Sequence, residues 1–141
     1  MIRSILAVLA GLIVIVVTSF GIEAAVDLLM LRMFPETLPN EAALSHNTPV
    51  WIFTFAYTFL CVIAGGYVSA RLAARSPVRH AVILGLLQSA LTIPAMIEFG
   101  DKARPWAWIV SMILVIPAAW LGGLIFSRRV TSRRAQVSVL A

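Results

Sequence analysis

Three carboxylates are the side chains of this chain best placed to do chemistry: Glu23, Asp27 and Glu98. Glu23 and Glu98 each end a long apolar run, and Asp27 follows Glu23 by four residues, which puts both on one face of a helix. Ionisable groups within a membrane-spanning segment often mark a path for protons or ions. The pattern therefore allows a small proton- or cation-coupled transporter. The simpler interpretation is that these acids mark where the apolar runs meet water.

Other candidate centres have little support in the sequence. His46 could join Glu36 and Glu41 at a metal ion, but their spacing matches no ligand pattern, so we predict no metal site. Cys61 is the one cysteine and cannot form a disulfide within the chain. The motifs of serine hydrolases, zinc proteases and phosphate-binding loops do not occur. We therefore expect no enzyme activity, no catalytic residues and no cofactor.

Four long apolar runs must position these residues. Hydrophobic residues make up 61% of the 141 residues and charged residues 12%, with a mean hydropathy of +0.98. A soluble domain has about 25% charged residues, so lipid must cover much of this surface. The predicted membrane spans are residues 4–25, 49–72, 78–98 and 105–127. An outer loop at 35–48 and a basic cytoplasmic tail at 128–141 complete a single integral membrane domain, residues 1–141.

Each span should be an α-helix, because backbone groups in lipid must pair within their own segment and the alternating pattern of a β-barrel is missing. Pro49, Pro77 and Pro105 support three of the helix starts, since proline at the first helical position loses no hydrogen bond. The short links predict antiparallel neighbours. The expected fold class is all-α: a membrane-embedded four-helix bundle of two antiparallel hairpins.

Charges are sorted by sign along the chain. All six acidic residues fall near one set of span ends, and most of the eleven basic residues fall near the other. Because Lys and Arg favour cytoplasmic loops, both termini should be cytoplasmic. The net charge of +5 then reflects membrane topology, and we expect no nucleic-acid partner. Arginines on this side would contact anionic lipid headgroups; they are Arg71, Arg75, Arg79, Arg128 and Arg129.

Small residues repeat at intervals of four in the second and fourth spans, a spacing that lets helix backbones approach closely. We predict helix contacts through Gly65, Gly66, Ser69, Ala118, Gly122 and Gly123. These contacts could join helices of one chain or of two chains, which leaves a homo-oligomer open. In the third span, Gln88 should form a hydrogen bond to another helix.

The second and fourth spans also share a pattern of aromatic, glycine and arginine residues. Trp51, Gly65, Gly66 and Arg71 recur in the same order and spacing as Trp108, Gly122, Gly123 and Arg128. Both spans would run from the outer to the inner side of the membrane. The pattern therefore has two explanations, a duplicated hairpin or the physical constraints that two such spans share.

Several short motifs are spread over nearly the whole chain. They are RSILAVLAGL at 3–12, FP at 34–35, GGYVSARLA at 65–73, WAW at 106–108 and PAAWLGG at 117–123. With these motifs the chain resembles a group of small bacterial four-helix membrane proteins of unassigned activity. The resemblance implies a location in the bacterial inner membrane and implies nothing about chemistry.

Two functional hypotheses follow from the sequence. The leading one is a non-enzymatic multi-pass inner-membrane protein that packs against itself, a membrane-protein partner or lipid. The alternative is a small proton- or cation-coupled transporter that uses Glu23 and Glu98. Ion flux in proteoliposomes, measured before and after replacing the two carboxylates, would separate the hypotheses.

Overall fold

The computed structural model describes residues 2–36, 47–73, 76–100 and 105–140. These residues form four α-helices: α1 (Ile2–Met33), α3 (Thr48–Leu72), α4 (Pro77–Phe99) and α5 (Pro105–Leu140). The helices pack against each other, and the described part of the chain contains no strand. The predicted all-α four-helix bundle is therefore confirmed.

Two of the helices run well past the predicted spans. α1 continues to Met33, and α5 continues to Leu140 through residues that we expected to form a tail. The reason lies in the sequence, because no glycine or proline follows Gly21 before Pro35, and none follows Gly123. α5 has 36 residues, or about 54 Å at 1.5 Å per residue. It is thus longer than a hydrocarbon core of about 30 Å.

The helix starts follow from local chemistry. Pro77 and Pro105 are the first residues of α4 and α5. α3 is capped by Asn47, whose side-chain oxygen accepts a hydrogen bond from the backbone N–H of Val50 at 3.3 Å. The residue before α4 is Ser76, whose φ of 51° lies in the left-handed region that is uncommon outside glycine. Ser76 therefore turns the backbone directly before α4 begins.

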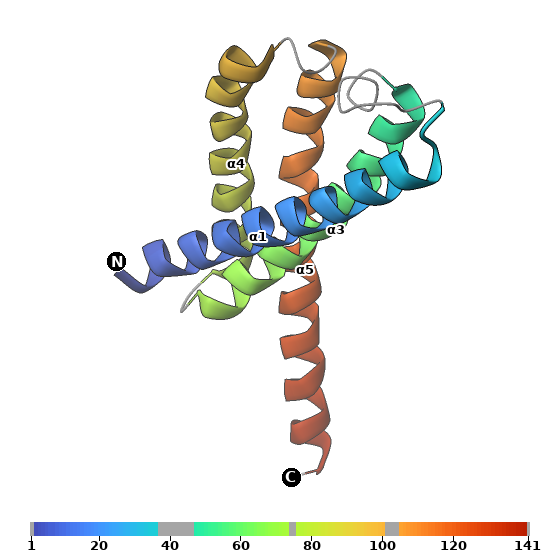
Figure 1. Cartoon of the computed structure of the whole chain (residues 1–141). Coiled ribbons are helices and arrows are strands. Elements are labelled where there is room, and N and C mark those ends of the chain that lie inside the picture. The colour runs from blue at the N-terminus through green and yellow to red at the C-terminus, as the bar shows by residue number, and fades with distance from the viewer. Residues whose placement is uncertain (1, 37–46, 74–75, 101–104, 141) are drawn as a thin grey trace.

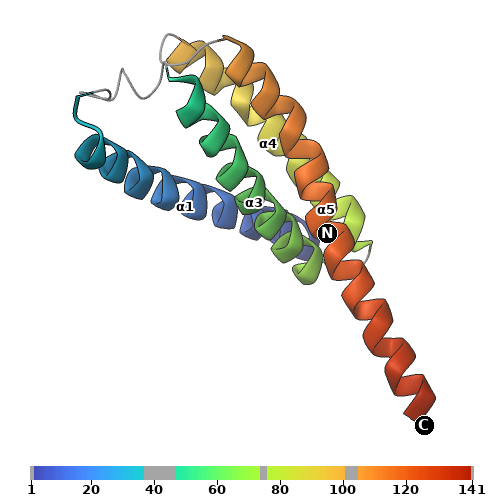
Figure 2. The ribbon, with the colours of Figure 1, turned by 90° about the vertical axis from the view of Figure 1, so that its right-hand side faces the viewer.

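Successive helices alternate in direction, as Figures 1 and 2 show. α1 packs against α3 and α4, α3 packs against α4 and α5, and α4 packs against α5. The N-terminus, the α3–α4 link and the last part of α5 share one end, which we call the arginine end after Arg3, Arg71, Arg79, Arg128 and Arg129. The other end, with the α1–α3 and α4–α5 links, is called the acidic end; it holds Asp27, Glu36 and Glu98.

The bundle is tight near the arginine end and splayed near the acidic end. Figure 2 shows α1 and α3 close together near the N-terminus of α1 and diverging toward the α1–α3 link. α5 projects beyond the other helices at the arginine end in both views. The N-terminal half of α1 is therefore part of the bundle, whereas its C-terminal half leans away from it.

Small side chains build the core. Six alanines are completely buried, and the largest fully buried apolar side chains are those of Leu84 and Val62. Many large apolar side chains point outward instead, such as Phe20 on α1 and Ile97 on α4. All four helices are long and apolar enough to cross a membrane. The outward-facing apolar surface is what such helices would present to lipid.

Candidate functional site

Glu23 and Asp27 lie on α1 in the half that leans away from the bundle, and Tyr57 lies opposite them on α3. Both carboxylates lie within electrostatic reach of the Tyr57 side chain, and they also interact with each other. Thr54, one turn earlier on α3, is a hydrogen-bond partner of Tyr57. α1 and α3 thus bring two acids and a phenol together where the helices begin to diverge.

Glu98 lies apart from this group. It occupies the exposed last turn of α4, at the acidic end of the bundle. Figures 1 and 2 show this end of α4 well separated from the corresponding end of α1. The two carboxylates that the transport hypothesis pairs, Glu23 and Glu98, therefore belong to separate parts of the molecule.

Around Glu23, α1 has no covered face. All six residues from 20 to 25 are exposed, which is more than one full helical turn. Phe20 is 68% exposed, and a methyl group placed on Gly21 would meet no atom within 4 Å. By contrast, Ala7, Gly11 and Ile15 are buried in the other half of the same helix. The cover of α1 is therefore interrupted at residues 20–25, and it resumes in part at Val26 and Asp27.

The predicted small residues of α3 and α5 lie where these two helices meet. A Cβ atom on Gly66 would overlap the backbone oxygen of Ala119, and one on Gly122 would overlap the backbone oxygen of Ile63. Gly123 faces α4 instead, with its Cβ position 2.7 Å from the Cβ atom of Ala81. The close approach of α3 and α5 is thus a contact of backbone on backbone within one chain.

Gly65 and Ser69 face α1 at a glycine that the sequence reasoning missed. A Cβ atom on Gly11 would lie 2.8 Å from the backbone oxygen of Gly65 and 2.7 Å from the Cδ2 atom of Leu84. Gly11 follows Ala7 by four residues, and this spacing of small residues could have revealed the contact. The same signal, Ala81 followed by Gly85, marks the second missed contact, where Gly85 meets α5.

Polar side chains inside the bundle are only partly satisfied. Ser89 donates a hydrogen bond from its hydroxyl to the backbone oxygen of Met112 at 3.3 Å and so links α4 to α5. The side-chain oxygen of Gln88 is buried and accepts no hydrogen bond within the described part of the chain. The predicted interhelical bond of Gln88 is therefore not made by this oxygen. The hydroxyl of the fully buried Ser69 is also unpaired.

A small apolar cavity lies between α3 and α5, beside the close contact. Its volume is about 30 Å³, and its walls include Phe59 and Val62 of α3 and Ser111 and Ala118 of α5. A cavity of this size has room for about one water molecule. Ser111 could only accept a hydrogen bond from such a water, because its hydroxyl already donates to the backbone oxygen of Ala107 at 2.9 Å. The cavity is therefore a packing defect rather than a substrate pocket.

Aromatic rings and arginines meet at the arginine end. The Tyr67 ring of α3 packs edge-on against the Phe126 ring of α5, with centroids 5.6 Å apart. The guanidinium carbon of Arg129 lies 5.8 Å from the centre of the Tyr67 ring. Arg71 lies in the last turn of α3, also at the arginine end. Arg75 lies outside the described residues. Sequence reasoning selected the arginines and missed Tyr67, which follows Ile63 and precedes Arg71 at helical spacing.

Comparisons with known proteins add no identity to this geometry. No protein-family model, no curated protein and no solved structure matches the chain. Within the described ranges, no three His, Cys, Asp or Glu side chains lie close enough to hold a metal ion. The loop residues Glu41 and His46 lie outside those ranges. The function must therefore be argued from the helices themselves.

Proposed function

We propose that the chain is a non-enzymatic multi-pass protein of the bacterial cytoplasmic membrane that acts by docking a transmembrane helix of a partner protein. Four helices with the length and apolar composition of membrane spans support the membrane location. Arginines at one end of the bundle and acids at the other support an orientation with both termini in the cytoplasm. The resemblance to small bacterial membrane proteins, carried by motifs such as RSILAVLAGL and GGYVSARLA, supports the bacterial membrane.

The observation that carries the proposal is the fully exposed turn of α1 at residues 20–25. Glycines at the helix contacts are buried, whereas the Cβ position of Gly21 has no atom within 4 Å and Ala25, four residues later, is exposed. This spacing is the one that lets a second helix approach closely in a membrane. A partner helix on this turn would extend the packing that Gly11 begins.

Glu23 lies in the same turn but on the opposite side of the helix from Gly21 and Ala25, because residues two apart point about 200° away from each other. A carboxylate that faces hydrocarbon costs several kcal/mol unless another polar group or water covers it. Glu23 is exposed on α1. It is the one polar side chain among residues 20–26. Glu23 has Asp27 and Tyr57 as polar neighbours within the chain, so Gly21 and Ala25 form the apolar face that is offered to a partner helix.

A photo-reactive amino acid at position 20 tests the proposal in native membranes. We expect a covalent adduct with a protein, because Phe20 borders the exposed turn. The same substitution at Ile113 is the matched control, since Ile113 is 63% exposed and lies on α5, which packs along α3 and α4. Position 113 should give lipid adducts only. An adduct pattern that is the same at both positions would contradict the proposal.

Gly21→Leu provides a second test that does not disturb the fold. The Cβ position of Gly21 has open space around it and leucine favours a helix more than glycine does, so the bundle should unfold at the wild-type temperature or slightly above it. The added side chain should nevertheless block a close helix contact, and we expect the adduct at position 20 to fall at least fivefold. Mass spectrometry of the adduct distinguishes a second copy of this chain from a different protein. An unchanged yield of adduct in the leucine variant would refute docking on this turn.

A second candidate function is proton or cation transport, which the grouping of Glu23, Asp27 and Tyr57 favours. Two acids that interact with a phenol across two helices form a plausible entry point for a cation. Ion flux into proteoliposomes would test this function, with Glu23→Gln and Asp27→Asn as variants and Glu98→Gln as the comparison. Flux that falls only in the first two variants would favour transport, and an impermeable wild type would exclude it for the ions tested.

A further inference from the structure

Guanidinium groups gather at the arginine end without any acidic partner. The six acidic residues of the chain belong to sequence segments 23–41 and 98–101, and none belongs to the segments that form this end. Among the described residues, Arg71, Arg79, Arg128 and Arg129 therefore have no carboxylate to pair with. Their counter-anion must come from outside the chain.

One of these arginines is held in a defined position. Arg129 lies over the face of the Tyr67 ring, with its guanidinium carbon 5.8 Å from the ring centre. Tyr67 is held in turn by the Phe126 ring, which meets it at an interplanar angle of 83°. A cation over an aromatic face gains about 0.5–1 kcal/mol at an exposed site, which narrows the positions that the side chain occupies.

The backbone below these rings is equally well defined. One turn before Phe126 on α5, the Cβ position of Gly122 lies 2.7 Å from the backbone nitrogen of Tyr67 and 3.0 Å from the carbonyl carbon of Gly66. Near the arginine end, α3 and α5 are therefore in direct backbone contact. One helix cannot shift along the other without breaking this contact. Arg129 and Tyr67 are attached to two segments with a fixed relative position.

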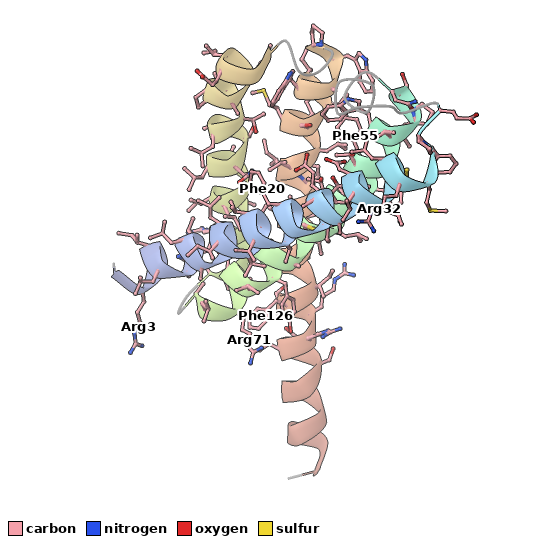
Figure 3. All side chains as sticks on the ribbon, in the orientation of Figure 1. Arg3, Phe20, Arg32, Phe55, Arg71 and Phe126 are labelled. Carbon is pink, nitrogen blue, oxygen red and sulfur yellow. The ribbon has the colours of Figure 1, made fainter. Side chains whose placement is uncertain are left out.

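Arg71 brings a second guanidinium to the same end. It follows Tyr67 by four residues and so extends from the same face of α3, in the last turn of the helix. Figure 3 shows the Arg71 guanidinium at the arginine end, pointing in the direction in which α5 leaves the bundle. Two cationic groups from two helices thus flank the Tyr67 and Phe126 rings.

We propose that the ends of α3 and α5 form a binding site for the headgroup of an anionic phospholipid, in which Arg71 and Arg129 contact the phosphate and Tyr67 positions Arg129. The site rests on the proposed membrane location, since both arginines come directly after apolar helical segments, at the depth of lipid phosphates. Guanidinium groups donate paired hydrogen bonds to phosphate oxygens, which suits this ligand better than a lone ammonium would. The Phe126 ring and the apolar surface below it would pack against the acyl chains.

Native mass spectrometry of the purified full chain in mild detergent tests the site. Phosphatidylglycerol is the anionic probe, phosphatidylcholine the zwitterionic one, and inorganic phosphate the competitor. Arg71→Gln and Arg129→Gln should each weaken phosphatidylglycerol binding about fivefold, which corresponds to about 1 kcal/mol per charge. Arg3→Gln is the matched control, because it removes an equal charge from the same end on α1 and should leave binding unchanged.

Tyr67 separates a built site from a diffuse positive charge. Tyr67→Phe keeps the aromatic face under Arg129 and should bind phosphatidylglycerol like the wild type, whereas Tyr67→Leu removes the face and should weaken binding two- to threefold. Thermal unfolding of both variants, followed by circular dichroism, shows whether each is folded. If Tyr67→Leu does not fold, the two arginine variants still decide between the outcomes.

Three results would overturn the proposal. They are an equal loss of phosphatidylglycerol binding in Arg3→Gln and Arg129→Gln, equal binding of phosphatidylglycerol and phosphatidylcholine by the wild type, or full displacement of bound phosphatidylglycerol by millimolar inorganic phosphate. The first would mean a general charge effect, and the third would mean a site for the free ion. Resistance of the same variants to carbonate extraction tests the membrane location separately. A chain washed from the membrane would refute the proposed function, whereas an inserted chain without lipid preference would refute only this site.

Discussion

Replacing Gly122 with alanine should separate α3 from α5 and destabilise the bundle. The new methyl group would overlap the backbone oxygen of Ile63 and would lie 2.7 Å from the backbone nitrogen of Tyr67. Both neighbours are backbone atoms, so no change of side-chain rotamer can make room. Because ordinary contacts between carbon atoms are about 3.5–4.0 Å long, the two helices must move apart by about 1 Å.

The expected cost follows from the kind of neighbour. An extra methylene in a packed core costs about 1–3 kcal/mol when side chains can adjust. At Gly122 the helices themselves must move, and the contact at Gly66 would loosen as well, so we expect about 3 kcal/mol. This loss would lower the folding equilibrium constant by a factor of about 100. Gly100→Ala is the matched control, since Gly100 has open space around it and an ordinary right-handed helical backbone.

Reversible unfolding of the purified chain in mixed micelles with increasing SDS measures this difference. Circular dichroism would monitor helix content, and tryptophan fluorescence would monitor the packing of the acidic end. Gly100→Ala should stay within about 0.5 kcal/mol of the wild type, as expected for a surface change. If Gly122→Ala is as stable as Gly100→Ala, then α3 and α5 are not in backbone contact and the packing described above is incorrect.

Three further changes test other features of the bundle. Ser69→Ala removes a buried hydroxyl that has no hydrogen-bond partner, so it should raise the free energy of unfolding by about 1 kcal/mol in the same SDS assay. A decrease of that size in the free energy of unfolding would mean that the hydroxyl is paired. Ser76→Gly should also stabilise the chain by about 1 kcal/mol, because glycine adopts a φ of 51° without strain, and a destabilised variant would contradict this backbone conformation. Cys61 is buried in α3, so a membrane-impermeant maleimide should label it only after SDS is added to proteoliposomes; rapid labelling in intact proteoliposomes would place it in a water-filled path instead.

Sequence periodicity and turn chemistry were sufficient for the elements of the fold. Pro77 and Pro105 marked the first residues of α4 and α5 because proline is favoured at the first helical position, although Pro94 and Pro117 lie inside the same two helices. The ends were harder, since the apolar character of a span ends at the membrane boundary while helix propensity does not. α5 thus continues through Arg128 and beyond, where no glycine or proline stops it.

The contacts between helices were predictable in kind and not in detail. Intervals of four residues identified Gly66 and Gly122 as contact residues, but the sequence could not say that they meet each other across α3 and α5. Pairing depends on helix rotation, which the nearly uniform apolar character of the spans does not reveal. For the same reason the role expected for Gln88 passed to its neighbour Ser89, which faces α5.

The candidate site shows the same limit. Glu23 and Asp27 were paired correctly by their spacing on one helix, whereas their partner Tyr57 comes from α3 and carries no signal in the sequence. The uncovered turn of α1 was not predictable either, because an acid such as Glu23 at the end of an apolar run indicates a water boundary equally well. Only the divergence of α1 from α3 distinguishes the two halves (Figure 2).

A photo-crosslinking scan along α1 in native membranes tests the docking of a partner helix most directly. One photo-reactive residue would be placed in turn at each position from Ile5 to Met33, and protein adducts to other chains would be measured. The account predicts no such adducts at the buried positions Ala7, Gly11 and Ile15, and adducts that begin beyond them and recur around the exposed turn at residues 20–25. Lipid adducts alone along the whole of α1 would contradict it.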